Sequence, residues 1–121
     1  MNQLVKVFHA LSDETRFRIL CCLFACKDKD LCVCEVADCL RIKLSTLSSH
    51  LNILKNAGLV STRKDGTWVY YRIDGSIPNF VIEAIKAGEI AEEDSKRLDK
   101  RLSLRVDNRC CIPVGALDSE K

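Results

Sequence analysis

The chain has 121 residues, of which 47% are apolar and 30% are charged, and its formal net charge is +2. This length suits one compact domain of the usual ~100–150 residues and leaves no room for a second core. No segment approaches the roughly 18 uninterrupted apolar residues of a membrane helix, and the first residues lack the basic-then-apolar order of a signal peptide, so we expect a cytoplasmic protein with no membrane partner.

The basic charge is concentrated in one segment. Residues 41–72 hold six basic side chains and one acid, which gives +5, so the rest of the chain carries −3. Because a local basic surface matters more to nucleic acid than the total charge, we expect this segment to face a polyanion.

The first half of the chain has the periodicity of helices. Apolar residues at helical spacing predict a helix near residues 3–11, and Ser12, followed by two acids, predicts the start of a second helix that ends at the polar run 27–30. Residues 31–40 predict a short third helix. A fourth is expected over 45–56, with Ser45 as its N-cap in place of Lys43, Gly58 beyond its end in the left-handed conformation, and a buried side formed by Leu47, Leu51 and Leu54.

After Gly58 the pattern alternates. Residues 59–63 and 67–73 flank Lys64-Asp65-Gly66, which predicts a β-hairpin. Pro78 opens a further helix to about residue 90, and Leu98 and Leu102 indicate that it continues or restarts. The predicted domain covers residues 1–104, and residues 105–121 read as a flexible tail that carries a cysteine pair.

Two short helices followed by a hairpin predict a mainly α fold with a small β-hairpin wing, a winged helix-turn-helix. In this fold the second helix of the pair enters the major groove of DNA and the wing touches the flanking backbone. The first helix and the helix after Pro78 carry more apolar surface than so small a core needs, so we expect them to pair in a homodimer.

Polar side chains on the predicted recognition helix and wing are candidates for DNA contact, because hydroxyl and basic groups reach phosphates and base edges. On the helix these are Ser45, Thr46, Ser48, Ser49 and His50. On the wing they are Arg63, Lys64, Thr67, Tyr70 and Arg72. Packing is the alternative for His50, and for Tyr70 and Trp68 within the hairpin.

Several segments together resemble the ArsR/SmtB family of metal-responsive repressors. The resemblance implies a homodimer that occupies double-stranded operator DNA without a cofactor and is released when an effector binds. A cysteine-x-cysteine element before the recognition helix implies As(III) or Sb(III) as the effector, with Cys32 and Cys34 as ligands. The matching segments are Ala10–Arg16, Leu31–Val36, Leu47–Leu51, Leu54–Val60 and Gly66–Arg72.

The third sulfur is not supplied by the same element. Trivalent arsenic favours three sulfurs in a pyramid, and Ala37 occupies the position where relatives have the third cysteine. Cys39 is about five residues, or roughly 140 degrees, from Cys34 on a helix, which points it toward the core. We therefore expect Cys110 or Cys111 to complete the site, from the same subunit or across the dimer. We also expect the helix amides to lower the pKa of Cys32 and Cys34.

Cys21, Cys22 and Cys26 lie in an apolar helix and are expected to pack in the core, with a separate sensor site at Cys21-Cys22 as the alternative. A repressor responsive to cadmium, lead or zinc, or to thiol oxidation, would share this fold. The resemblance disfavours zinc, because zinc sensors of this family use carboxylates and histidines on the C-terminal dimer helix, and neither of the two histidines, His9 and His50, lies there. A thiol-dependent enzyme such as an arsenate reductase is disfavoured, since no phosphate-binding loop or C-x-x-C motif is present.

Overall fold

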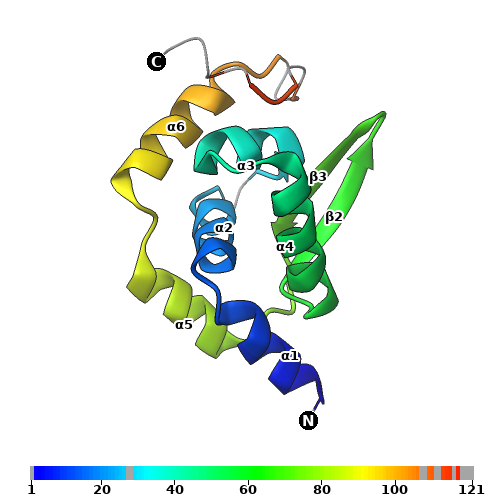
Figure 1. Ribbon diagram of the computed structural model, residues 1–121, viewed down its shortest axis with the longest axis vertical. Coiled ribbons are helices and arrows are strands. Elements are labelled where there is room, and N and C mark those ends of the chain that lie inside the picture. The colour runs from blue at the N-terminus through cyan, green and yellow to red at the C-terminus, as the bar shows by residue number, and fades with distance from the viewer. Residues whose placement is uncertain (1, 27–28, 107–108, 111–112, 116, 118–121) are drawn as a thin grey trace.

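The computed structural model describes residues 2–26, 29–106, 109–110, 113–115 and 117. Its order is α1 (Asn2–Leu11), α2 (Glu14–Ala25), β1 (Leu31–Cys32), α3 (Val33–Leu40), α4 (Leu44–Asn56), β2 (Val60–Asp65), β3 (Trp68–Ile73), α5 (Asn79–Gly88) and α6 (Glu92–Leu102). Figure 1 shows α2, α3 and α4 at the centre, the hairpin projecting from one side, and α5 and α6 along the other. The predicted mainly α fold with a hairpin wing is confirmed.

The starts of two helices differ from the prediction. The side chain of Asp13 accepts a hydrogen bond from the Arg16 amide and caps α2, whereas the Ser12 hydroxyl donates back to the His9 carbonyl at the end of α1. Helix α4 begins at Leu44 with Lys43 in the N-cap position, so Ser45 is not its cap. Gly58 has the predicted left-handed conformation (φ 77°) just beyond α4.

The predicted hairpin is present as β2 and β3, and β1 adds a third antiparallel strand that was not predicted. The strand order in the sheet is β1-β3-β2, because Leu31 pairs with Tyr71 and Cys32 with Tyr70. Strands β2 and β3 pair from Val60–Ile73 to Asp65–Trp68, and Gly66 takes a positive φ of 63° at the first loop position. The sheet joins the base of the wing to the beginning of α3.

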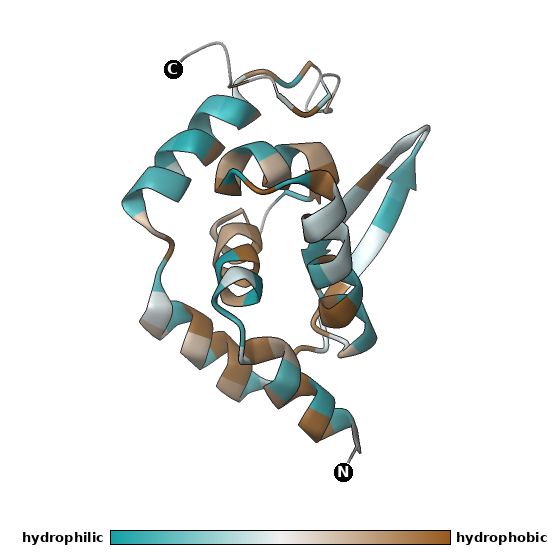
Figure 2. Ribbon diagram, viewed as in Figure 1, coloured by the Kyte–Doolittle hydropathy of each residue, from teal (hydrophilic) through white to brown (hydrophobic). Residues whose placement is uncertain are grey.

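One continuous core lies under the central helices. It contains the predicted residues of the recognition helix, Leu47, Leu51 and Leu54, none of which is exposed. Figure 2 shows apolar residues along α1 and α5 and polar residues along α6. No helix in the described part of the chain is both long and apolar enough to cross a bilayer.

Candidate functional site

The recognition helix α4 presents short polar side chains to solvent. Its buried leucines face the core, which leaves Ser45, Thr46, Ser48 and Ser49 exposed on the other side. The Ser49 hydroxyl donates to the Ser45 carbonyl at 3.3 Å. These side chains are accessible for contact with a phosphate or a base edge.

His50 is half-buried and lies against the start of α2. Its Nδ1 is 3.3 Å from an Arg16 nitrogen and 4.0 Å from an Asp13 carboxylate oxygen. Because a guanidinium can only donate, Nδ1 accepts this bond, so a neutral ring carries its proton on Nε2. Arg16 also donates to the Ala10 and His9 carbonyls, at 2.9 and 3.0 Å, and thereby ties α1, α2 and α4 together.

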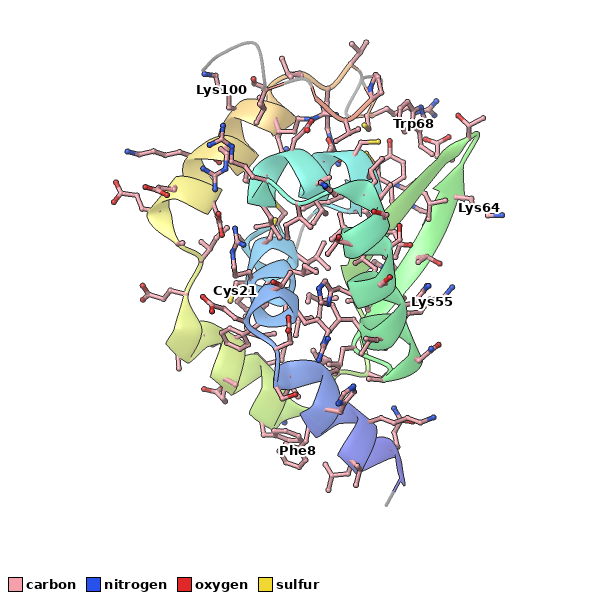
Figure 3. The ribbon with its side chains drawn as sticks, in the orientation of Figure 1. Phe8, Cys21, Lys55, Lys64, Trp68 and Lys100 are labelled. Carbon is pink, nitrogen blue, oxygen red and sulfur yellow. The ribbon has the colours of Figure 1, made fainter. Side chains whose placement is uncertain are left out.

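The wing carries exposed basic residues. Arg63, Lys64, Thr67 and Arg72 all lie on the surface, and Figure 3 shows Lys64 pointing outward near the wing tip and Lys55 outward from α4. Arg63 is held by Asp30 at 2.6 Å and lies over the Tyr70 ring at 4.5 Å.

Tyr70 is a correction to the predicted contact set. Its side chain is only 1% exposed, because it faces inward from β3 and packs with the thiols of Cys32, Cys34 and Cys110. In this conformation its hydroxyl accepts a hydrogen bond from the Cys110 amide at 2.8 Å and is not available to DNA. The alternative expected for Tyr70, packing within the hairpin, fits this position.

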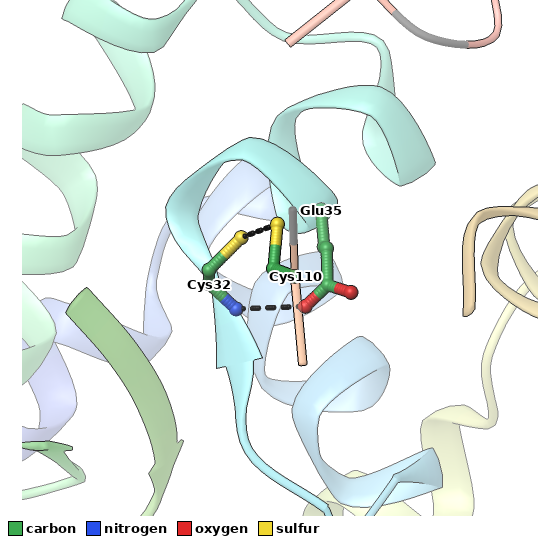
Figure 4. Close-up of side chains that lie close together, drawn as sticks. All are labelled: Cys32, Glu35 and Cys110. Atoms are coloured by element: carbon green, nitrogen blue, oxygen red, sulfur yellow. Dashed lines mark hydrogen bonds between the residues drawn. The ribbon is translucent and has the colours of Figure 1, made fainter. Parts of the chain in front are cut away.

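A cluster of buried thiols lies at the N-terminal end of α3. The Sγ atoms of Cys32 and Cys110 are 2.8 Å apart, and Cys34 belongs to the same buried cluster. Figure 4 shows Cys32 and Cys110 facing each other, with the Glu35 carboxylate beside them. Within the described part of the chain, Cys32, Glu35 and Cys110 form a group whose candidate ligand atoms lie within 4.8 Å of one another.

Local structure positions Cys32 as the N-cap of α3. The Glu35 carboxylate accepts a hydrogen bond from the Cys32 amide at 3.0 Å, and the Glu35 amide faces the Cys32 thiol, which is the reciprocal arrangement of a capping box. Cys32 also pairs with Tyr70 in the sheet. One thiol is therefore attached to both α3 and the wing strand.

Cys110 is brought to this site by the segment after α6. Arg105 is bound to Glu35 through two bonds of 2.6 Å, and a nitrogen of Arg101 lies 3.9 Å from the Cys110 sulfur. The described residues of the predicted tail thus pack against α3 within one subunit, where they find buried ionic partners. Cys111, also expected as a ligand, lies outside the described residues.

Cys34 is 8% exposed, and the Val114 amide faces its thiol. Its sulfur is not part of the group of Cys32, Glu35 and Cys110, so it would have to move to share an ion with both of the other thiols.

Burial raises the pKa of the Cys34 thiol, and burial together with the hydrogen bond to Cys110 raises the pKa of Cys32 well above its usual range. The expected lowering of both pKa values was wrong. The Cys32 and Cys34 side chains lie inside the protein, where desolvation outweighs the helix amides.

Two buried ion pairs surround the thiols and were missed from the sequence. Arg101 donates to Asp38 at 2.8 Å, and Arg105 binds Glu35; the side chains of Arg101 and Glu35 are fully buried. Part of the signal was available. Glu35 and Asp38 are three residues apart on α3, and Arg97 and Arg101 are four apart on α6, so each pair of charges lies on one side of its helix. Arg105 lies beyond the end of α6.

The other four described cysteines do not belong to this cluster. Cys22 and Cys39 are fully buried and Cys21 is 5% exposed, all within the main core, and Cys26 packs half-buried at its edge. Core packing for Cys21 and Cys22 and an inward direction for Cys39 are both confirmed.

Residues 13–62 match the model of the bacterial regulatory protein arsR family. The arsenic resistance transcriptional regulator ArsR1 of Pseudomonas putida is 38% identical over 90% of this chain and 84% of its own length. The arsenical resistance operon repressor of Escherichia coli is 33% identical over 74% of this chain and 75% of its own. A cadmium resistance regulatory protein CadC homolog of Staphylococcus aureus is 46% identical, but over only 57% of this chain and 55% of its own.

Solved structures share the fold. HlyU from Vibrio cholerae aligns with a TM-score of 0.59 and 34% identity, over 71% of this chain and 87% of its own. The homodimeric winged helix-turn-helix domain of Mb0332 from Mycobacterium bovis aligns with a TM-score of 0.58 and 31% identity, over 72% of this chain and 75% of its own. The antimony-specific transcriptional repressor AntR aligns with a TM-score of 0.59 and 25% identity, over 72% of this chain and 74% of its own.

The arrangement of α3, α4 and the wing, the exposed polar face of α4, and the extent of the match to ArsR1 lead to one identification. The chain belongs to the arsR family of bacterial regulatory proteins and is a DNA-binding transcriptional repressor, not an enzyme.

Proposed function

We propose that the protein represses transcription as a homodimer on operator DNA and dissociates when As(III) or Sb(III) binds Cys32, Cys34 and Cys110. The single observation that carries this proposal is the 2.8 Å separation of the Cys32 and Cys110 sulfurs, with Cys34 in the same buried cluster. The arsenic regulators among its relatives and the antimony-specific repressor support it. DNA binding itself requires no cofactor in this scheme, and the protein acts in the cytoplasm, where thiols are kept reduced.

The sulfur geometry suggests how binding would change the protein. With arsenic–sulfur bonds of about 2.3 Å, similar to zinc–thiolate bonds, and angles of roughly 100° at the pyramidal ion, two thiolates lie roughly 3.5 Å apart. The Cys32 and Cys110 sulfurs at 2.8 Å would then separate by about 0.7 Å on binding, while Cys34 moves toward them. The effector therefore favours a conformation different from the free one.

This movement would reach the DNA-binding elements through Cys32. The residue caps α3, which precedes the recognition helix, and it pairs with Tyr70 on the wing strand. A shift of Cys32 therefore alters the angle between α4 and the wing. A coupling free energy of about 1–3 kcal/mol, typical of allosteric proteins, suffices to lower DNA affinity about 5- to 150-fold.

Exposed apolar residues support the homodimer. Phe8 of α1 and Phe80 of α5 are 56% and 43% exposed, and their ring centroids are 5.6 Å apart. Leu4 and Val5 extend the same apolar surface on α1. A Phe80→Glu variant is expected to sediment as a monomer, whereas Val106→Glu, at a more exposed apolar position after α6, should remain dimeric.

Two alternatives to a metalloid effector are a divalent metal ion and oxidation of the thiols. Cadmium, lead or zinc would use the Glu35 carboxylate with two thiols, but Arg105 occupies both oxygens of this carboxylate. Oxidation by a peroxide would join Cys32 and Cys110 in a disulfide with release of two waters, and the short sulfur separation favours this second candidate. Reversal by a monothiol reductant, without a chelating dithiol, would identify oxidation.

The experiment begins with an operator selected from a random duplex library by the reduced protein. Fluorescence anisotropy then follows its release by arsenite, antimonite, cadmium, lead and zinc. We expect arsenite or antimonite to release wild-type protein and the Cys21→Ser control at low concentration, and to leave Cys32→Ser bound. Release by cadmium or zinc alone, or by peroxide alone, would refute the metalloid proposal.

A further inference from the structure

A second group of thiols lies at the C-terminal end of α3. Cys39 of α3 and Cys22 of α2 are both fully buried, and their sulfurs are 3.5 Å apart. The Cys39 thiol also donates to the Asp94 carbonyl at 3.2 Å. This pair connects α2, α3 and the first turn of α6, and the proposed function makes no use of it.

A third thiol is adjacent in the chain. Cys26 is the C-cap residue of α2, four positions after Cys22, so the two residues lie on the same side of the helix. Cys26 is only half-buried and can be reached from solvent. The Cys26 side chain packs against the same apolar core that contains Cys22 and Cys39.

We propose that Cys22, Cys26 and Cys39 form a second binding site for a trivalent metalloid, separate from the Cys32 cluster. The 3.5 Å between Cys22 and Cys39 already matches the roughly 3.5 Å that two thiolates of one pyramidal ion keep. Cys26 does not lie within 4.8 Å of both other sulfurs in the described conformation, so its side chain must turn inward to complete the site. Its place at the end of α2 permits that turn.

The chemistry of exchange favours a trivalent metalloid here. Arsenous acid, As(OH)₃, reacts with three thiols to form three As–S bonds and three water molecules; each thiol proton leaves with a hydroxyl, and the oxidation state stays +3. Reactant and product are both neutral. A divalent ion with three thiolates would instead leave one negative charge in an apolar core, which is costly to bury without a partner.

The surroundings of the two sites differ in this respect. At the first site Arg101, which is bound to Asp38 at 2.8 Å, also lies 3.9 Å from the Cys110 sulfur. At the second site the nearby Arg18 and Arg97 are bound to the Asp94 carboxylate, at 3.0 and 2.7 Å. Because three thiolates leave no net charge with a trivalent metalloid and one negative charge with a divalent ion, the second site favours trivalent arsenic or antimony over cadmium and zinc.

Binding would also change the packing of α6. A sulfur bonded to arsenic has no proton to donate, so the hydrogen bond from Cys39 to the Asp94 carbonyl would be lost. The second site thus weakens one link between α3 and α6 when it is occupied.

The test measures how many arsenic atoms the full chain binds. Reduced protein is titrated with arsenite and examined by native mass spectrometry, as wild type and as a four-serine variant in which Cys32, Cys34, Cys110 and Cys111 are replaced. We expect two arsenic atoms per wild-type chain and one per four-serine chain. Adding Cys26→Ser should weaken the remaining binding at least tenfold, whereas adding the matched control Cys21→Ser should leave it unchanged.

A four-serine chain that binds no arsenic, or binds one that Cys26→Ser does not weaken, would overturn this proposal. If that variant does not fold, as judged by circular dichroism, the single Cys26→Ser variant decides: two atoms falling to one supports the site, and an unchanged stoichiometry refutes it. If instead the Cys32 cluster is not a metalloid site, the stoichiometry distinguishes this outcome from failure of the second site. Wild type would then bind one arsenic, and the four-serine chain would still bind one.

Discussion

The two ends of α3 hold cysteines in contrasting surroundings. At the N-terminal end, Cys32 and Cys110 lie among the buried ion pairs of Arg101 and Arg105 and beside the wing. At the C-terminal end, Cys22 and Cys39 lie in the main apolar core. The first end joins α3 to the wing strand and to the segment after α6, so under the proposed function a ligand there would move the elements that contact DNA. The second end joins helices that form the core.

The largest difference between the two ends is expected in their ion pairs. Replacing Arg101 by Met leaves the buried Asp38 carboxylate without this partner, which should cost about 3–5 kcal/mol of unfolding free energy. The control is Arg97→Met at the other end, where Arg18 still binds Asp94, and its loss should be about 1 kcal/mol or less. Urea unfolding measures both, and equal losses would contradict the contrast.

The next effect concerns the response to the ligand. Cys32→Ser and Cys34→Ser should each bind operator as wild type does but lose the effector-induced drop in affinity, a coupling of about 1–3 kcal/mol. Cys39→Ala, at the other end of α3, should keep the response. Anisotropy titrations with and without arsenite measure this. Full loss of DNA binding in both serine variants would show that these cysteines serve the fold instead.

The raised thiol pKa values predict how pH separates the effectors. Since Cys32 and Cys34 are protonated up to high pH, cadmium must displace their protons, and its affinity should rise about tenfold per pH unit for each proton released. Arsenous acid releases water instead, so its affinity should stay level between about pH 6 and 8. Calorimetry in buffers of different ionisation enthalpy counts the protons, and an equal count for both ligands would refute this scheme.

The smallest effect is on stability in alkali. An ordinary thiol loses its proton near pH 9.0, whereas folded Cys26 does so near 11. Above pH 9 the unfolded chain therefore binds fewer protons than the folded one. The stabilising contribution is complete below pH 9 and should decline as the pH rises to about 11. Cys26→Ser should make this decline shallower in unfolding experiments, and an identical decline in both proteins would assign it to other groups.

Local signals predicted most of the DNA-binding unit. The leucines of α4, Gly58 after it and the Asp65-Gly66 turn act within a few residues, so their outcome can be read from neighbouring positions. Strand β1 could not be predicted in this way. It has only two residues, and it exists because Leu31 and Cys32 pair with Tyr71 and Tyr70, about forty positions further on.

The thiol site was also predicted only in part, because some of its features depend on residues far apart in the sequence. The motif indicated Cys32 and Cys34, and the lack of a packing role for two adjacent cysteines near the C-terminus indicated Cys110 as a candidate. The buried setting of these thiols depends on Arg101 and Arg105, whose partners Asp38 and Glu35 are more than sixty residues away. The error in the direction of the pKa shifts follows from this, since burial is a property of the whole fold.

The position of Cys110 has a consequence for the order in which the protein is synthesised. Cys110 follows Cys32 by 78 positions, whereas the recognition helix and wing are complete by residue 73. The ribosome therefore completes the recognition helix and the wing well before it adds the last cysteine of the proposed effector site. A premature stop codon between Arg105 and Cys110 would keep the Arg105–Glu35 ion pair and yield a shortened repressor that occupies its operator and ignores the effector. In a cell that also makes the intact protein, such chains would join it in mixed dimers and silence the controlled genes dominantly.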